Sequence, residues 1–362
     1  MRLLLNWKRA TALLSALVIA STMIAWPQSA SAAGGFNLTL SPLPISLKAK
    51  PGETITTPLS VQNTGSEAVR LKVSLMKFGA NGTAGEPSIE DPAPNDEFIK
   101  WVKFSKTTFV AEPGVLNTIT MTIKIPQDAG FGYYYAATFN QDSGDQPKVK
   151  NQNAVSGAVA SLILLDVDAP GSKRELQVTS FATTQKIYQY LPATFTVKVK
   201  NSGNVHAVPR GNIFVGRSGS SDFLGTLSIN KEQGNVLPNS SRVFTVAWKD
   251  GFPSYEIKRQ NGQIVSDKEG QPVEELKWDL GNANKLRFGK YTASMTLVYD
   301  NGTQDVPING VVSFWVIPWI PLLILLGILV FVGLGVFFIV RSFYKRIKKV
   351  GKKPKKSKES TE

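Results

Sequence analysis

The residues that most often carry catalysis are scarce in this chain. Its 362 residues include one histidine, His206, and no cysteine. A Ser-His-Asp triad, a histidine general base or a histidine zinc site would need this single side chain, which lies in the turn-like segment GNVHAVPRG. The lack of cysteine excludes thiol nucleophiles and cysteine-ligated metals. The sequence therefore predicts that the protein is not an enzyme and has no cofactor, with a carboxylate-based glycosidase as the remaining enzymatic alternative.

Acidic side chains gather in one polar segment, residues 79–97, at Glu90, Asp91, Asp96 and Glu97. Calcium would need six to eight oxygen ligands at defined positions, and two prolines interrupt the run. We therefore interpret the segment as a solvated acidic loop without a metal. Its four acids are candidate contacts for a partner protein or a glycan.

The most aromatic segment is GFGYYYAATF, residues 130–139. On a β-strand, Phe131, Tyr133, Tyr135 and Phe139 share one face and Tyr134 occupies the other. Core packing accounts for the first face. Tyr134 is predicted to face solvent or a partner, so it is the aromatic candidate for glycan or protein contact.

Four charged residues surround a turn-forming segment near residue 170. Asp166 and Asp168 end an apolar strand, and Lys173 and Arg174 follow after Ala-Pro-Gly-Ser. The two acids lie on one side of the strand and could bind a cation. Pairing with the neighbouring bases is the preferred interpretation.

Short runs with period-two alternation, separated by Gly, Pro, Asn and Asp, fill residues 33–315 and predict an all-β fold. In TITMTIKIP, residues 118–126, isoleucine or methionine occurs at every second position, which gives one apolar face and one polar face. VQNTG at residues 61–65 returns as VKNSG at 199–203. We interpret this pair as strand ends with asparagine-stabilised turns, used in two copies of one fold.

The chain therefore divides into two tandem immunoglobulin-like β-sandwich domains, residues 33–170 and 171–315. Two polar, turn-rich insertions, 79–97 and 252–277, are the places where partners are most easily contacted. DNG at residues 300–302 predicts a β-hairpin.

The two ends predict a secreted, membrane-anchored topology. Residues 1–32 have the basic, apolar and small-residue regions of a cleaved signal peptide. Residues 316–340 form an uncharged apolar stretch, of which the 24 residues from 317 span about 36 Å as a helix. Residues 341–362 form a basic tail, which places the C-terminus in the cytoplasm and the two domains outside. Trp315 and Trp319 are expected at the outer membrane interface and Tyr344 at the inner one.

The formal charge of +14 comes from these ends. Residues 33–340 contain 28 basic and 25 acidic residues, which is nearly neutral. This distribution argues against nucleic-acid binding and for contact of the tail with anionic lipid.

The architecture and two segments, SPLPISLKAKPGETITTPLSVQNTG and IPQDAGFGYYYAATF, resemble the WxL-interacting surface proteins of Gram-positive bacteria. The resemblance implies a sandwich-like first domain associated with peptidoglycan binding. It also implies a second domain that attaches to host or partner proteins.

The leading hypothesis is a single-pass bacterial surface protein that binds cell-wall glycan, such as peptidoglycan, or another surface protein through its extracellular domains. A structural or accessory subunit of a membrane complex, with no ligand of its own, is the alternative. The oligomeric state is left open by the sequence.

Overall fold

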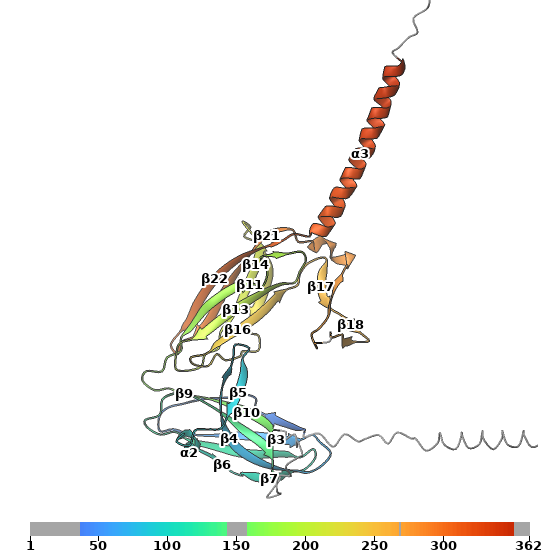
Figure 1. Cartoon of the computed structure of the whole chain (residues 1–362). Helices are drawn as coiled ribbons and strands as arrows, with labels where there is room; N and C mark the ends of the chain where they lie inside the picture. Colours follow the sequence, from blue (N-terminus) through green and yellow to red (C-terminus); the bar gives the residue numbers. More distant parts are fainter. Residues whose placement is uncertain (1–36, 143–157, 268, 351–362) are drawn as a thin grey trace, which may run out of the picture.

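The computed structural model describes residues 37–142, 158–267 and 269–350. Two β-sandwiches follow one another and meet end to end at an angle, and a long helix leaves the far end of the second (Figure 1). The predicted fold class, all-β with two immunoglobulin-like sandwiches and one C-terminal apolar helix, is confirmed. The predicted signal peptide lies outside the described residues.

The first domain contains two sheets and one short helix. One sheet has the order β1-β3-β8-β6, and the other has the order β2-β10-β9-β4-β5, with β7 also paired to β4. The elements are β1 (Leu38–Ser41), β2 (Ile45–Ala49), β3 (Thr54–Asn63), β4 (Val69–Asn81), β5 (Glu86–Glu90), α2 (Phe98–Trp101), β6 (Val102–Phe104), β7 (Thr108–Ala111), β8 (Leu116–Lys124), β9 (Phe131–Gln141) and β10 (Ala158–Val167).

The second domain has the sheet orders β11-β13-β16 and β12-β22-β21-β14-β15. Its strands are β11 (Leu176–Thr183), β12 (Ile187–Tyr188), β13 (Ala193–Asn201), β14 (Arg210–Arg217), β15 (Phe223–Ile229), β16 (Ser241–Trp248), β21 (Gly289–Asp300) and β22 (Asp305–Val316). The predicted DNG hairpin joins β21 to β22, with Asp300 opposite Asp305. In each domain the first strand of the second sheet, β2 or β12, runs parallel to the last strand.

The repeated pentapeptide occupies the same place in both domains. Asn63 ends β3 and Asn201 ends β13, and both side chains are buried. The Asn63 amide donates to the carbonyls of Glu67 and Ala111 at 2.7 and 2.9 Å, while its oxygen accepts the Gly65 N–H. Asn201 repeats this pattern: its amide donates to the carbonyls of Val205 and Val236, and its oxygen accepts the Gly203 N–H. The interpretation of the pair as a mark of the fold is confirmed.

Each sandwich has its own apolar core, with members from Leu40 to Val167 in one and from Leu176 to Val316 in the other. The alternating strands supply them as predicted: Ile119, Met121 and Ile123 of β8 are buried in the first core. A one-residue slip of β8 would expose this whole set, which fixes its register against β3.

Two further elements extend from the second domain. The insertion after β16 forms an arm of paired short strands, β17 (Ser254–Ile257) with β20 (Glu274–Lys277) and β18 (Arg259–Gln260) with β19 (Gln263–Ile264). A 3₁₀ turn, η1 (Leu280–Lys285), leads back to β21. The helix α3 (Trp319–Val350) begins three residues after β22, and its apolar part, Trp319–Lys345, is long enough to cross a membrane.

Candidate partner-binding groove

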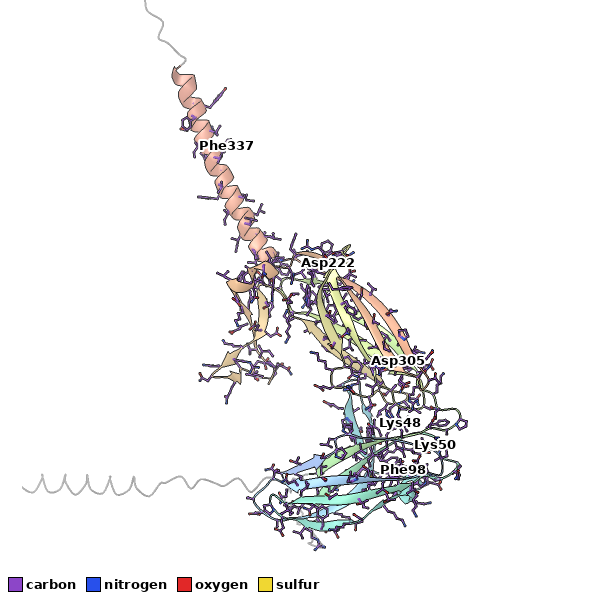
Figure 2. All side chains as sticks on the ribbon, turned by 180° about the vertical axis from the view of Figure 1, so that it is seen from behind. Lys48, Lys50, Phe98, Asp222, Asp305 and Phe337 are labelled. Atoms are coloured by element: carbon purple, nitrogen blue, oxygen red, sulfur yellow. The ribbon has the colours of Figure 1, made fainter. Side chains whose placement is uncertain are left out.

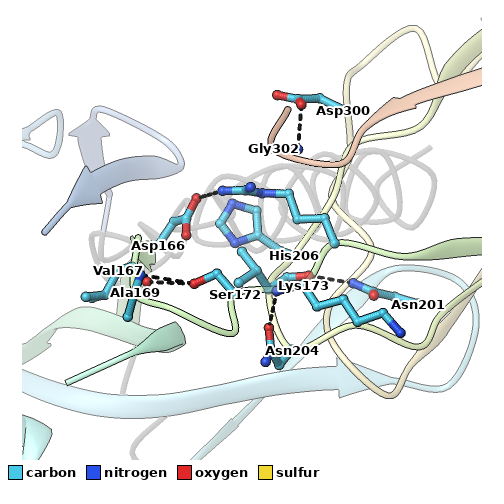
Figure 3. Close-up of polar contacts among 12 residues, drawn as sticks. Asp166, Val167, Ala169, Ser172, Lys173, Asn201, Asn204, His206, Asp300 and Gly302 are labelled. Atoms are coloured by element: carbon cyan, nitrogen blue, oxygen red, sulfur yellow. Dashed lines mark hydrogen bonds and ion pairs between the residues drawn. The ribbon is translucent and has the colours of Figure 1, made fainter. Parts of the chain in front are cut away.

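The two sandwiches are joined by a buried ion pair. Asp166, at the end of β10, is 2% exposed, and the Arg174 guanidinium reaches it from the connecting segment (Figure 3). The predicted pairing of the junction charges is confirmed for these two residues. Because both groups are largely withdrawn from water, removing one partner would leave an unpaired buried charge.

Tyr134 also joins the domains, which corrects the prediction that it faces solvent or an external partner. Its hydroxyl accepts the backbone N–H of His206 at 2.7 Å and lies 3.3 Å from the His206 Nδ1. The Tyr134 ring packs in T-shaped contacts with the rings of Phe78 and His206. Burial raises the pKa of Tyr134 and lowers the pKa of His206 to about 4. Tyr134 is therefore covered by the second domain.

The connecting segment lies tightly against the turn that follows Asn201. The Lys173 carbonyl accepts the N–H groups of Asn204 and Val205, and the Asn204 side chain contacts the Lys173 N–H at 2.7 Å (Figure 3). A side chain at Gly203 would overlap the Lys173 carbonyl. The glycine of the repeated motif thus permits the close approach of the connection in the second domain.

A second contact between the domains comes from the insertion 79–97. The hairpin β4–β5 rises from the first domain to β16 (Figure 1), and the Thr83 carbonyl in its tip accepts the Val243 N–H at 2.8 Å. The Arg242 guanidinium packs against Gly85, which has φ +85°, and donates to the Asn235 carbonyl. This insertion, predicted as a contact for external partners, contacts the chain's own second domain.

The edge of β16 continues beyond Thr83 with outward-facing backbone groups. β16 pairs with β13 on one side only, within the part of the chain that the structure describes. Along an antiparallel strand, the backbone N–H and C=O groups of successive residues point alternately toward the partner strand and away from it. Since the Val243 N–H faces away toward Thr83, the N–H and C=O groups of Thr245 and Ala247 also face the free edge.

This free edge forms one wall of a groove of about 460 Å³. The opposite wall comes from the end of β15 and the turn after it, including Ser228, Asn230 and Lys231, and Ala84 of the hairpin closes one end. Three bases, Lys231, Arg242 and Lys249, and one acid, Glu232, line it. The groove is therefore net positive and offers unpaired strand backbone.

The four predicted acidic contacts do not lie together in a site. Asp96 accepts the Tyr135 hydroxyl at 2.6 Å and the Phe98 N–H at 3.2 Å, so it positions α2 on the first core. The Glu97 Oε1 lies 3.9 Å from the Lys100 Nζ, and both side chains are exposed to solvent. Glu90 and Asp91 are exposed, and the Ser88 hydroxyl donates to Glu90. The Asp96 carboxylate is thus used within the fold, and contact of the four acids with a partner stays a prediction.

The predicted membrane-interface residues stand at the two ends of the apolar helix region. Trp315 on β22 and Trp319 at the start of α3 are each 45% exposed, and Tyr344 is exposed near the other end. This placement follows the expected order along the chain. Their contact with lipid stays a prediction.

Sequence reasoning missed the groove residues. The side chains of these residues, Val243, Thr245 and Ala247, carry no catalytic or charged group. Their proposed role in binding depends on the direction of their backbone N–H and C=O groups. The alternation in RVFTVAW indicates the strand, but only the strand order shows that its edge is open.

No family model and no curated protein matches the sequence. Solved structures with a similar β-sandwich fold include the class 5 fimbriae chaperone CfaA, 18% identical over 67% of this chain and 100% of that chain, at a TM-score of 0.34. The CupB2 chaperone of Pseudomonas aeruginosa is 10% identical over 77% and 100%, at 0.32. PapD-like domain 7 of human CEP192 is 13% identical over 37% and 86%, at 0.24. These likenesses concern the fold alone.

Proposed function

We propose that this chain is a non-enzymatic, membrane-anchored surface protein that binds an extended segment of another protein along the free edge of β16. The single observation that carries the proposal is the row of outward-facing backbone groups at Thr245 and Ala247 beside a groove. An extended peptide can add to such an edge as a further strand, with main-chain hydrogen bonds supplying affinity.

The chain's own hairpin supports this mode of binding. Thr83, in the turn of the hairpin, already accepts the Val243 N–H at the same edge, so a backbone carbonyl from another segment can reach this edge. The edge is open for the next four residues, from Phe244 to Ala247. Lys231, Arg242 and Lys249 favour a segment with acidic side chains next to the paired residues.

The alternative ligand, a cell-wall glycan, is less well supported, because its main candidate contact residue packs against the second domain. It depended on an exposed Tyr134, and the Tyr134 hydroxyl contacts His206 instead. A protein segment therefore fits the described surface better than a sugar.

The C-terminal helix supports anchoring of this binding unit at a membrane. Its apolar part has 27 residues, its most apolar window of 18 residues has a mean hydropathy of 3.1, and none of that window is buried against the rest of the protein. Basic residues follow it, which favours an outside location for the two domains. The first domain then stands farthest from the bilayer (Figure 1).

Selection of random 12-residue peptides on the full chain in lipid nanodiscs tests the strand-addition proposal. We expect enriched peptides with alternating side chains and acidic residues. Their binding should be lost in Thr245→Pro, because proline removes the N–H that pairs with the added strand. Thr245→Val keeps that N–H and should bind like the wild type.

Loss of binding in Thr245→Pro has meaning only in a folded domain. Proline is tolerated at outward positions of edge strands, so the melting temperature should change little. Equal binding by Thr245→Pro and the wild type would contradict strand addition at β16. No enrichment of any peptide would also contradict it and would favour an accessory subunit without a ligand of its own.

A further inference from the structure

The end of the second domain from which α3 leaves carries a group of exposed apolar side chains. They lie between 45% and 78% exposed: Ile187, Phe223, Leu280, Leu286, Phe288 and Trp315. We call them the apolar rim. Scattered exposed apolar residues are ordinary, but a group of this size at one end of a domain marks an interaction surface.

The pairing of the strands places the rim beside the start of the helix. Trp315 pairs with Ile187 on one side and with Lys290 on the other, four residues before α3 begins. Phe288 comes directly before Gly289, which pairs with Val316. Asp222, the neighbour of Phe223, lies at the end of the domain that bears the helix (Figure 2).

In the segment Leu286-Arg287-Phe288, the charged side chain points inward and the two apolar side chains point outward. Arg287 turns inward, where it contacts the Asp250 carboxylate at 2.6 Å and lies over the Trp248 ring. Leu286 and Phe288, on either side of it, are 51% and 52% exposed. A strand end in water would present the arginine and bury its apolar neighbours.

Leu280 is held outward by a capped turn. The Asp279 carboxylate accepts the Gly281 N–H at 3.0 Å and the Asn282 side-chain amide at 2.8 Å, which fixes the start of η1. Leu280 is 78% exposed at the outer side of this turn. The apolar side chain is thus presented by a structured element.

We propose that the apolar rim inserts into the outer interface of the lipid bilayer, so that the second domain rests on the membrane that α3 crosses. The bilayer is the occupant because the rim continues from the first residues of the helix and contains Trp and Phe, which suit the interface. This inference rests on the proposed membrane span and goes beyond it, since a helix alone would leave the domain free to tilt.

Depth-dependent quenching tests the inference, and the cysteine-free chain permits single labels. The full chain is reconstituted in vesicles that contain nitroxide-labelled lipid. An environment-sensitive fluorophore is attached in turn to Leu280→Cys, Phe288→Cys, Leu326→Cys in α3, and Leu116→Cys. Leu116 is 61% exposed in the first domain and serves as the control.

We expect several-fold quenching at 280, 288 and 326, and none at 116. Quenching at 326 alone would overturn insertion of the rim while preserving the anchor, and would point to a protein subunit or water at this surface. No quenching at 326 would overturn the membrane span and with it the rim. Quenching at 116 would also contradict the inference, because the first domain would then lie on the bilayer.

Discussion

At the scale of single residues, the two sandwiches are coupled by groups that are costly to bury separately. Asp166 with Arg174, and Tyr134 with His206, place polar atoms from both domains in one largely buried junction. Such groups stabilise the junction only while both partners are present. The junction therefore favours one fixed arrangement of the domains.

Replacing Arg174 with methionine should destabilise the chain by about 3 kcal/mol, because Asp166 would remain buried and charged without a partner. The double variant Asp166→Leu with Arg174→Met should regain most of this loss. Urea unfolding of the three proteins in detergent measures the difference. A single variant as stable as the wild type would show that the ion pair does not hold the junction.

Acid should weaken the junction through His206. Its pKa is lowered to about 4 by burial, below its ordinary value of 6.5, so below about pH 6.5 the unfolded chain binds a proton that the folded chain excludes. The free energy of unfolding therefore has its full value above about pH 6.5, where His206 is neutral in both the folded and the unfolded chain. It falls by roughly 3 kcal/mol as the pH drops to 4.

Urea midpoints of the wild type and His206→Gln between pH 7 and pH 4 measure this effect. The wild type should lose more stability than the variant, since other titrating groups are common to both. Parallel curves for the two proteins would mean that His206 is accessible to protons in the folded chain.

At the scale of elements, the β4–β5 hairpin holds the first domain against β16. Gly85→Val should loosen this contact because a side chain there would overlap Arg242. Gly82→Val has similar backbone strain, with φ +61°, but no atom within 4 Å of the added Cβ, so it is the matched control. Hydrogen exchange of the Val243 amide should accelerate more in Gly85→Val. Equal rates in the two variants would show that the tip does not dock.

The buried asparagine at each repeated turn should be as important in one domain as in the other. Asn63→Ala and Asn201→Ala each remove two donated hydrogen bonds and one accepted bond, which should cost about 2 kcal/mol or more. Asn309→Ala, at an exposed position of β22, should have little effect. Thermal unfolding measures all three, and a neutral Asn201→Ala would contradict the structural reading of the motif.

The sequence predicts what depends on local pattern. The alternation in β8 and β13, the DNG hairpin and the Asn-x-Gly turns all follow from side chains close together in the chain. It does not predict what depends on strand order. Tyr134 meets His206 across 72 residues, and the open edge of β16 depends on which strands pair with β13. The alternation of apolar residues shows which face of a strand is buried, but it does not show which segment of the chain packs against that face.

At the scale of the whole molecule, the structure is a bent pair of sandwiches attached to an apolar helix (Figure 1). The junction and the hairpin are two separate contacts between the domains, and together they keep β16 in one orientation to the first domain. The helix leaves from the other end. In the proposed arrangement, the groove lies between the bilayer and the first domain, where another surface protein can reach it.

The most direct test of strand addition at β16 is photo-crosslinking in the native membrane. A photoreactive amino acid replaces Thr245 in the full chain, and Asn309, exposed on β22, is the control position. We predict a discrete crosslinked protein at position 245 that is absent at 309, and its crosslinked peptide should be an extended, partly acidic segment. No adduct at 245, or the same adduct at both positions, would contradict the account.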